Sequence, residues 1–314
     1  FEAYEALIHR GGQATRVLDR NAAVLFEEAD DGTGDRPEVP RGELRRILID
    51  SLPEATVQWG HKVAAVASLG AGRHRLTFAN GASVDTDLLI GADGAWSKVR
   101  PLLSADTPAY SGLTFVETYL FDSDAQHAAS AAAVGGGAMY AVEPGKGILA
   151  HREPGGTLHT YVELQKPKEW FDAILRKDPR TIAALVAKEF DGWAPALRAL
   201  ISAGETAPVI RPIHALPTNH RWERSPGVTL LGDAAHLMIP SGEGANLAML
   251  DGAELAAAIA SHPQDLEAAL GHYEAELFPR SAQESAAAES LTHILLGKDT
   301  PRSLVEFFAH PPGS

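Results

Sequence analysis

One run of residues, from Leu230 to Asn246, has the order of side chains needed to bind a negatively charged, hydroxyl-rich ligand. It begins with an apolar stretch, continues with a Gly-Asp pair and passes through a loop rich in Pro and Gly. We predict a strand that ends on a carboxylate and a loop that leads to a helix N-terminus, where exposed N–H groups favour negative charge. Ligands of open α/β sheets bind outside such strand ends, and glycines let the backbone approach them closely. The predicted ligand-binding residues are Gly232, Asp233, Pro240, Gly242, Gly244, Ala245 and Asn246.

A second run, from Asp87 to Arg100, has a similar order of strand, turn and helix start. Its short apolar strand is of the kind that is buried on both faces of a parallel sheet. The turn that follows contains Asp93. Because Asp-Gly and Gly-Asp pairs are common in ordinary turns, their interpretation depends on the complete runs, their order and their separation.

A third candidate is Arg41, at the start of a predicted helix in which apolar residues recur at helical spacing. A cation at a helix N-terminus opposes the helix dipole unless an anion lies nearby. We therefore expect an anion near Arg41. For Arg45 and Arg46 we favour a solvated helix face.

The strand predicted at 158–165 alternates apolar residues with polar and aromatic ones, so one of its faces is polar and aromatic. The candidate substrate residues are His159 and Tyr161 on this strand and Glu117, which lies between aromatic residues on an earlier one. The same alternation would equally suit an exposed sheet face. His236 could serve as an acid or base, although packing within its own run is the favoured interpretation.

Three patterns show how these residues would be positioned. The segment 74–86 predicts a hairpin, because Asn80-Gly81 tolerates positive φ at both turn positions. Alternation with glycine-rich breaks over 112–165 predicts a β-rich insert, and 263–296 predicts a long amphipathic helix. The predicted division is an α/β domain in two parts, 1–104 and 195–260, a β-rich substrate domain at 105–194 and a C-terminal helical segment at 261–314.

Composition narrows the possible partners. The 314 residues carry a formal charge of −14, which disfavours nucleic acid and anionic membranes. No apolar run approaches the roughly 18 residues of a membrane span. The chain has no cysteine, which excludes disulfides and thiolate catalysis and, with no visible secretory signal, makes the cytoplasm the expected location. No metal-spaced cluster, Gly-x-Ser-x-Gly or P-loop is found, so no metal is predicted.

Both runs resemble the motifs of the group A flavoprotein monooxygenases. Within that family the chain is most similar to the tetracycline-inactivating enzymes, through Arg41 to Arg45, Trp96 to Arg100, Gly232 to Met238, and Gly156 to His159 followed by Lys166 to Trp170. The resemblance implies a Rossmann-like α/β FAD-binding domain of the para-hydroxybenzoate hydroxylase type, a β-sheet substrate domain and a long C-terminal helix.

The resemblance also implies an activity. A family member uses FAD, NADPH or NADH, and O2 to hydroxylate or otherwise oxygenate an aromatic or polyketide-like molecule through a flavin hydroperoxide, and the tetracycline enzymes confer antibiotic resistance. It further implies that Arg41 contacts FAD, that Asp93 lies by the FAD pyrophosphate, that His159 faces the substrate, and that the protein is a monomer. Where the tetracycline enzymes carry an amide, this chain has Glu117, which puts the substrate in doubt.

The family's N-terminal strand, Gly-x-Gly-x-x-Gly and helix are not found in this sequence. We therefore expect an incomplete FAD-binding domain, and weak or no FAD binding by these 314 residues alone. Two alternatives stay open. One is another flavin oxidoreductase, of the halogenase or reductase type, and the other is a truncated, non-catalytic domain that binds a small molecule.

Overall fold

The computed structural model describes residues 2–8, 12–32 and 37–310. Its residues fall into two compact units, one formed by 1–56, 112–212 and 292–314 and the other by 57–111 and 213–291. Three elements, β7 (Ala109–Leu120), β11 (Val209–Ala215) and α10 (Leu266–Leu296), contain a boundary between the two units.

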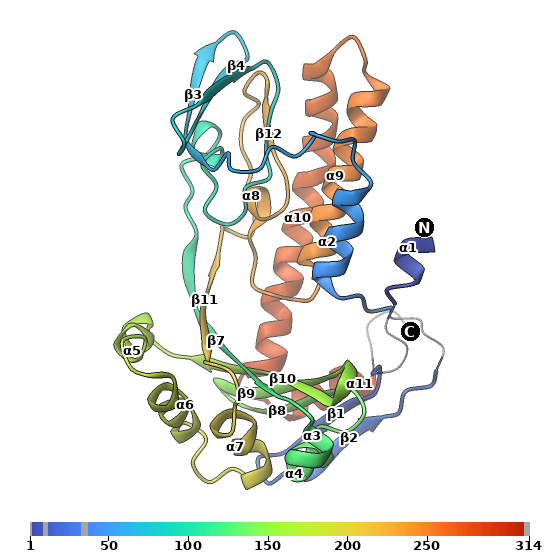
Figure 1. Cartoon of the computed structure of the whole chain (residues 1–314), viewed down its shortest axis with the longest axis vertical. Coiled ribbons are helices and arrows are strands. Elements are labelled where there is room, and N and C mark those ends of the chain that lie inside the picture. The colour runs from blue at the N-terminus through green and yellow to red at the C-terminus, as the bar shows by residue number, and fades with distance from the viewer. Residues whose placement is uncertain (1, 9–11, 33–36, 311–314) are drawn as a thin grey trace. The chain divides into compact units, whose positions relative to one another are not determined.

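The first unit is built on a seven-stranded sheet in the order β11-β7-β10-β9-β8-β1-β2 (Figure 1). Neighbouring strands with a printed register are antiparallel, except that β1 and β8 are parallel. The further strands are β1 (Thr15–Leu18), β2 (Val24–Glu28), β8 (Ala138–Glu143), β9 (Lys146–Glu153) and β10 (Thr157–Gln165). The helices are α1 (Glu2–Glu5), α2 (Arg41–Asp50), α3 (Ser123–Gln126), α4 (Ala128–Val134), α5 (Lys168–Ile174), α6 (Pro179–Lys188), α7 (Pro195–Ser202) and α11 (Arg302–Ala309), with a 3-10 turn at Pro154–Gly156.

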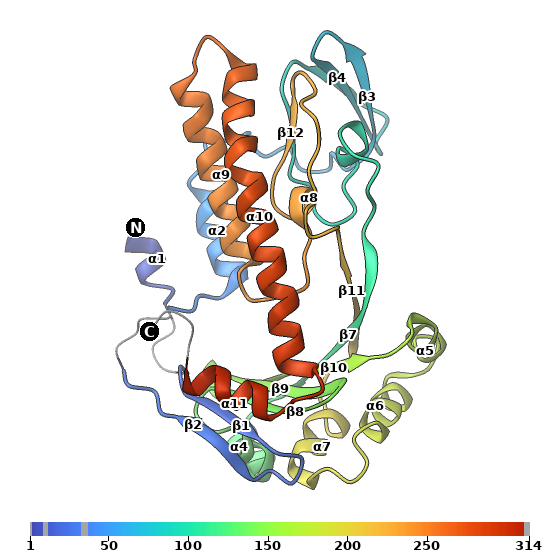
Figure 2. The same cartoon turned by 180° about the vertical axis from the view of Figure 1, so that it is seen from behind.

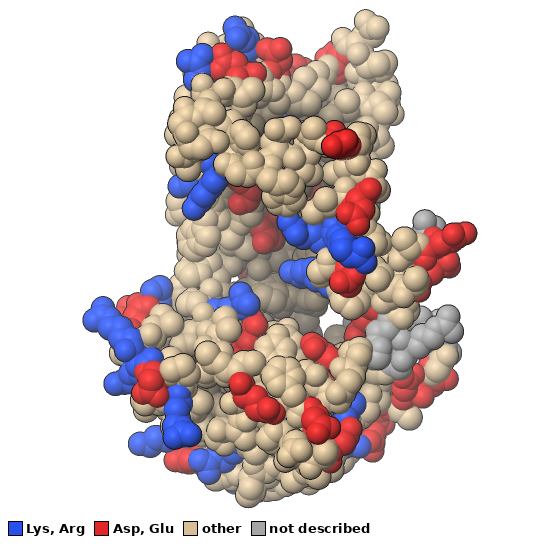
Figure 3. Space-filling model, in the orientation of Figure 1, with Lys and Arg blue, Asp and Glu red and all other residues tan. Residues whose placement is uncertain are grey.

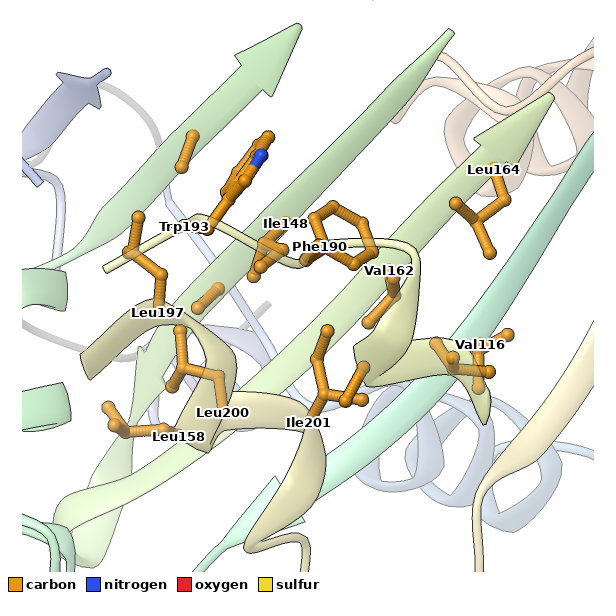
Figure 4. Close-up of a cluster of buried hydrophobic side chains, with 14 of the residues drawn as sticks. Val116, Ile148, Leu158, Val162, Leu164, Phe190, Trp193, Leu197, Leu200 and Ile201 are labelled. Atoms are coloured by element: carbon orange, nitrogen blue, oxygen red, sulfur yellow. The ribbon is translucent and has the colours of Figure 1, made fainter. Parts of the chain in front are cut away.

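The apolar face of this sheet packs against α5, α6 and α7. The even-numbered residues of β10 and their neighbours on β7 and β9 point into this core, as the alternation of the sequence predicts. Figure 4 shows them facing residues from α7 and from the turn between α6 and α7: Val116, Ile148, Leu158, Val162 and Leu164 face Phe190, Trp193, Leu197, Leu200 and Ile201. Each fully buried aliphatic side chain contributes roughly 1.5–3 kcal/mol, so this cluster holds the helices on the sheet.

The opposite face is partly covered by α11. Phe308 stacks on Phe26 of β2 with ring centroids 5.8 Å apart and lies 5.4 Å from the ring of Tyr140 on β8. Figure 2 shows α11 lying across this end of the sheet. The odd-numbered residues of β10 lie on the same face, beside the part that α11 covers.

The second unit has a two-stranded parallel sheet, a three-stranded antiparallel sheet in the order β3-β4-β5, and helices. Figure 2 shows α9 and α10 side by side in this unit. The elements are β3 (Val63–Gly70), β4 (Arg73–Phe78), β5 (Ser83–Thr86), β6 (Leu89–Gly91), β12 (Val228–Leu230), α8 (Asp233–His236), α9 (Gly244–Ser261) and most of α10, with a 3-10 turn at Arg100–Leu102. Its buried cluster includes Leu89, Val99, Val228, Leu230, Leu255, Leu270, Tyr273 and Leu277.

The predicted hairpin is confirmed as β4 and β5, but its turn differs from the prediction. Only Gly81 has a positive φ, of 86°, and Asn80 instead accepts a hydrogen bond from the N–H of Ala82 through Oδ1. The asparagine is therefore used for its side-chain acceptor and not for a left-handed backbone.

The observed division differs from the expected boundaries at 104/105, 194/195 and 260/261. The first 56 residues join the sheet unit because β1 pairs with β8, more than a hundred positions away. The chain from 57 to 111 joins 213–291 because β6 pairs with β12. Local sequence patterns specify the strands but not these pairings.

Among the described residues, no helix is both long and apolar enough to cross a membrane. Acidic and basic side chains are interspersed on the face seen in Figure 3, and neither sign forms one continuous patch there. A local site can therefore bind an anion even though the net charge is −14.

Candidate functional site

The Gly-Asp run forms the expected strand end and helix start in the second unit. The buried strand β12 leads to Gly232, whose φ is 57°, and Asp233 then begins α8. A Cβ on Gly232 would lie 3.1 Å from the Cβ of Ala248, so this position favours glycine for its backbone and for its space. The side chain of Asp233 is exposed at the end of the strand.

The glycines of the following loop leave room for a ligand. Gly242 has a φ of 96°, and a Cβ added at Gly242 or at Gly244 would meet no atom within 4 Å. Glu243 precedes α9 and does not cap it with its side chain. The first turn of this 18-residue helix can therefore receive an anion at its N–H groups.

This arrangement fits FAD, because an exposed carboxylate can accept hydrogen bonds from a ribityl chain and the open glycine loop can lie against an anionic edge. The other predicted residues of the run take ordinary positions. Pro240 is exposed and Ala245 is half-buried, and Asn246 donates to Oε2 of Glu243 at 3.1 Å. Their contacts with a cofactor stay predictions.

The second run ends in a buried arginine that joins the two runs. Arg100 is 3% exposed, and it donates from Nε to the carbonyl of Ala234 at 2.8 Å and from Nη2 to the carbonyls of Ala95 and Asp233 at 2.9 and 3.0 Å. Burial lowers the pKa of Arg100, while Asp93 and Asp233 act in the opposite direction. The guanidinium thus fixes the backbone of Asp233.

Asp93 shapes its own loop. Its Oδ1 accepts from Oγ of Ser97 at 2.5 Å, and its Oδ2 accepts from the N–H of Lys98 at 2.6 Å. The carboxylate is exposed, so it can accept further bonds from a ligand. Its predicted contact with FAD stays a prediction.

The strand before Asp93, β6, ends on Gly91, and the space around this residue explains why it is a glycine. A Cβ on Gly91 would lie 2.5 Å from Cδ2 of Leu230 and 2.8 Å from Cβ of Val99. Only glycine therefore allows β6 to pair this closely with β12. The strand is less buried than predicted, since Ile90 is 36% exposed.

A fully buried carboxylate supports the Gly-Asp run from α9. Asp251 accepts from the N–H of Gly232 at 2.8 Å, lies 2.6 Å from Nε2 of His236, and accepts from Nη2 of Arg280 at 2.9 Å. Burial alone would raise the pKa of Asp251, but these bonds outweigh it and hold the pKa below its usual value. His236 therefore packs within its run, which agrees with the favoured interpretation of the sequence.

In the first unit, the candidate substrate residues lie together on the polar face of β7 and β10. The register pairs His159 with Tyr119 and Tyr161 with Glu117. The ring of His159 lies 4.1 Å from that of Tyr119 and 4.2 Å from that of Tyr161, centroid to centroid. Both His159 and Glu117 are 8% exposed, so the face is not the exposed sheet surface that the alternation also allowed.

The hydrogen bonds of His159 leave one ring nitrogen available. Its Nδ1 lies 2.9 Å from Oε1 of Glu153, whereas its buried Nε2 has no hydrogen-bond partner among the described residues. The nearest carboxylate to Nε2 is Glu117, at 3.9 Å. This nitrogen can therefore exchange a hydrogen bond with a further group, and the contact of His159 with a substrate stays a prediction.

Glu117 is bonded to an arginine from β11. Arg211 donates to Oε1 of Glu117 from Nε and to Oε2 from Nη2 at 3.3 Å. Burial, followed by Glu117 and other neighbours, raises the pKa of Tyr161 to about 12. Farther along β10, burial raises the pKa of Glu163 to about 8, so this carboxyl is largely protonated at neutral pH.

Arg41 is exposed at the first position of α2, in the first unit. No residue of this helix is buried, and Arg46 pairs with Glu43 and Asp50 on its surface. That pairing is the solvated face predicted for Arg46, and the contact of Arg41 with FAD stays a prediction.

Several residues of the two candidate sites are not predicted from the sequence. Arg100 reaches the Gly-Asp run from 133 positions away and Asp251 from 19, and Glu153 and Arg211 complete the cluster around His159. Arg100 could have been noticed from its place at the end of the second run. No local spacing signals the others.

A scan against family models finds one described as an FAD binding domain, which matches residues 5–287. The chain belongs to this FAD-binding family. The Gly-Asp and Asp-Gly runs and the polar face of β10 all lie within the matched residues, and the fold is the mixed α/β fold with a long C-terminal helix expected for it.

Two curated relatives of this FAD-binding chain are oxygenating enzymes. The monooxygenase penA of Penicillium thymicola is 31% identical over 288 residues, which cover 78% of this chain and 66% of the relative. The FAD-dependent urate hydroxylase of Klebsiella pneumoniae subsp. pneumoniae is 32% identical over 271 residues, 85% of this chain and 67% of the relative. The chain thus spans about two thirds of the length of these relatives.

Solved structures of the family are similar in fold. Klebsiella pneumoniae HpxO, solved with FAD and uric acid, has a TM-score of 0.79 and 27% identity and covers 98% of this chain and 77% of its own. The tetracycline destructase Tet(51) has a TM-score of 0.66 and 17% identity. The match covers 96% of this chain and 78% of the Tet(51) chain. At that identity, the likeness to Tet(51) shows the fold alone.

Proposed function

We propose that this chain is most of an FAD-dependent monooxygenase that uses NADPH or NADH and O2 to oxygenate an aromatic or polyketide-like small molecule. The observation that carries the proposal is the exposed carboxylate of Asp233, whose backbone carbonyl is bonded by Arg100, beside an open glycine loop inside a matched FAD-binding domain. The names of the relatives support the reaction class. One is a monooxygenase, a second is an FAD-dependent urate hydroxylase, and a third is 3-amino-4-hydroxybenzoate 2-monooxygenase.

The residues that would hold FAD follow from their positions. Asp233 would accept hydrogen bonds from the ribityl hydroxyls, and the N-terminus of α9, with Gly242 and Gly244 before its first turn, would receive the negative edge of the ring system. Arg41 and Asp93 are proposed as further contacts. When bound, FAD supplies the transfer of electrons from the nicotinamide and the activation of oxygen, so the protein needs only to bind, orient and exclude water.

The substrate would bind on the polar face of β7 and β10. The rings of Tyr161 and Tyr119 offer an aromatic surface. The unpartnered Nε2 of His159 can accept or donate one hydrogen bond to a substrate hydroxyl, according to its tautomer, while Glu153 fixes the ring through Nδ1. Glu117 lies close enough to orient a donor on the same substrate.

The proposal is tested by titrating the purified chain with FAD and following flavin fluorescence and absorbance. The flavin-loaded protein is then supplied with NADPH or NADH, 18O2 and candidate phenols. We expect substrate-stimulated oxidation of the nicotinamide and one 18O atom in the product. Halide incorporation, or reduction of the substrate without oxygen transfer, would instead establish one of the other flavin chemistries. Because weak binding by these 314 residues alone is expected, only absence of flavin binding in the full-length protein as well would remove the enzyme proposal.

We further propose a monomer located in the cytoplasm, as the sequence predicts. Light scattering on the purified chain tests the first part, and fractionation of the source cells tests the second.

A further inference from the structure

The polar face of β7 and β10, where the substrate would bind, is called the substrate face below. Its positively charged groups already have carboxylate partners. Arg211 is bonded to Glu117, and His159 is bonded through Nδ1 to Glu153. Arg211 and His159 therefore each have their own carboxylate, and His151, opposite His159 on β9, lies 3.5 Å from Glu38. A substrate that brought a further negative charge would have to compete with Glu117 or Glu153 for these partners.

The pKa values of Tyr119 and Tyr161 are also raised on this face, so their anionic forms are disfavoured. Burial raises the pKa of Tyr119, and the carboxylates of Glu117 and Glu153 raise it further. Tyr161 shifts in the same direction from burial first and then from Glu117. Groups that become anions on this face are thus disfavoured both by lost hydration and by like charge.

We infer that Glu117 makes this face selective for phenols that are neutral or carry an amine, and against aromatic substrates that carry a carboxylate. This inference rests on the proposed function, in which the face binds the substrate. Glu117 would act in two ways: it occupies the guanidinium of Arg211, and its second oxygen, 3.9 Å from the open Nε2 of His159, lies beside the ring nitrogen that a phenol hydroxyl would meet.

The substitution Glu117→Gln keeps the shape of this side chain but removes its charge. Arg211 would then lose its carboxylate partner on this face and become available to an anionic ligand. The charge preference of the site should therefore weaken or reverse, while the ring stack around His159 stays in place.

Calorimetric titration of the FAD-loaded full chain at pH 7 tests the inference with three probes that share a phenol and a two-carbon side chain. These are 4-ethylphenol, which is neutral, tyramine, which is cationic, and 3-(4-hydroxyphenyl)propanoate, which is anionic. We expect the anion to bind at least about tenfold more weakly than the other two, and Glu117→Gln to reduce that ratio by about tenfold.

Glu163→Gln is the matched control, because Glu163 is on the same strand face but is buried and largely uncharged at neutral pH. Its charge preference should equal that of the unmodified chain. Equal or tighter binding of the anion, binding of no probe, or an equal change in Glu163→Gln would overturn the inference. Flavin content and 18O incorporation are measured separately, so a protein that oxygenates phenols but prefers the anion refutes the selectivity alone.

Discussion

The Nε2 atom of His236 lies 2.6 Å from Oδ2 of Asp251, and the same oxygen accepts the N–H of Gly232 at 2.8 Å. One buried carboxylate from α9 therefore fixes both the glycine that precedes Asp233 and the histidine that follows it. His236 is used to hold the loop and not to meet a ligand. Asp251 is, on this basis, a positioning residue for the proposed flavin contact.

Replacing Asp251 should destabilise the second unit. Asp251→Ala leaves His236 and Arg280 without their buried partner, and breaking such a pair costs about 3–5 kcal/mol. Urea denaturation followed by circular dichroism measures the free energy of unfolding. Glu43→Ala, at an exposed ion pair with Arg46, serves as the control and should leave the midpoint unchanged. Equal stability of the two variants would contradict the buried network.

Removing the arginine that joins the two runs should affect both stability and flavin binding. Arg100→Met leaves the carbonyls of Ala95, Asp233 and Ala234 without this donor, which costs roughly 2–3 kcal/mol for buried acceptors. The affinity for FAD, measured by fluorescence titration, should fall at the same time because Asp233 loses its support. Lys98→Met, an exposed cation two positions earlier, should change neither quantity.

Asp233→Ala should weaken FAD binding by about tenfold or more without unfolding the protein, because a charge-assisted hydrogen bond is lost from an exposed side chain. Flavin titration and thermal unfolding on the same sample separate the two effects. Glu223→Ala removes another exposed carboxylate of the same unit and should bind FAD normally. A variant without Asp233 that retains full affinity would show that the ribityl contact is made elsewhere.

His159→Ala should raise KM for a phenolic substrate by about tenfold to a hundredfold and leave flavin content unchanged, since both the stacked ring and its open nitrogen are lost. Steady-state oxidation of the nicotinamide gives KM, and the flavin spectrum gives occupancy. His127→Ala, at the ion pair with Glu205, is the matched histidine control. A loss of flavin in His159→Ala would argue against a role confined to the substrate.

Glu163 should make stability fall as pH rises. Burial raises its folded pKa to about 8 from an ordinary value of 4.5. The folded state therefore holds a proton that the unfolded state releases, so the full contribution is present below pH 4.5 and is lost as pH rises towards 8. Relative to Glu163→Gln, the chain should lose up to about 1.4 kcal/mol for each pH unit in that window. Denaturation at several pH values measures this, and parallel curves would contradict it.

The sequence was most informative where a pattern is local. The alternation at 158–165 correctly divides β10 into a core face and the face of His159, and the strand, Gly232-Asp233 and glycine loop occur in the predicted order. Local pattern could not show that Arg211 bonds to Glu117, which lies 94 positions away. It also could not show that Arg100 reaches the backbone of Asp233 across 133 positions, because such contacts are set by tertiary packing.

The seven-stranded sheet of the first unit has a consequence for synthesis on the ribosome. Its strand β1 pairs with β8 from more than a hundred residues away, and its α11 comes from near position 300. The β3-β4-β5 hairpins can form as soon as they emerge, because their contacts are local. The face of the sheet on which α11 packs cannot be covered until α11 has left the ribosome, so apolar residues such as Val17, which clusters with Leu304, stay uncovered until then. We expect nascent chains to depend on chaperones during this interval.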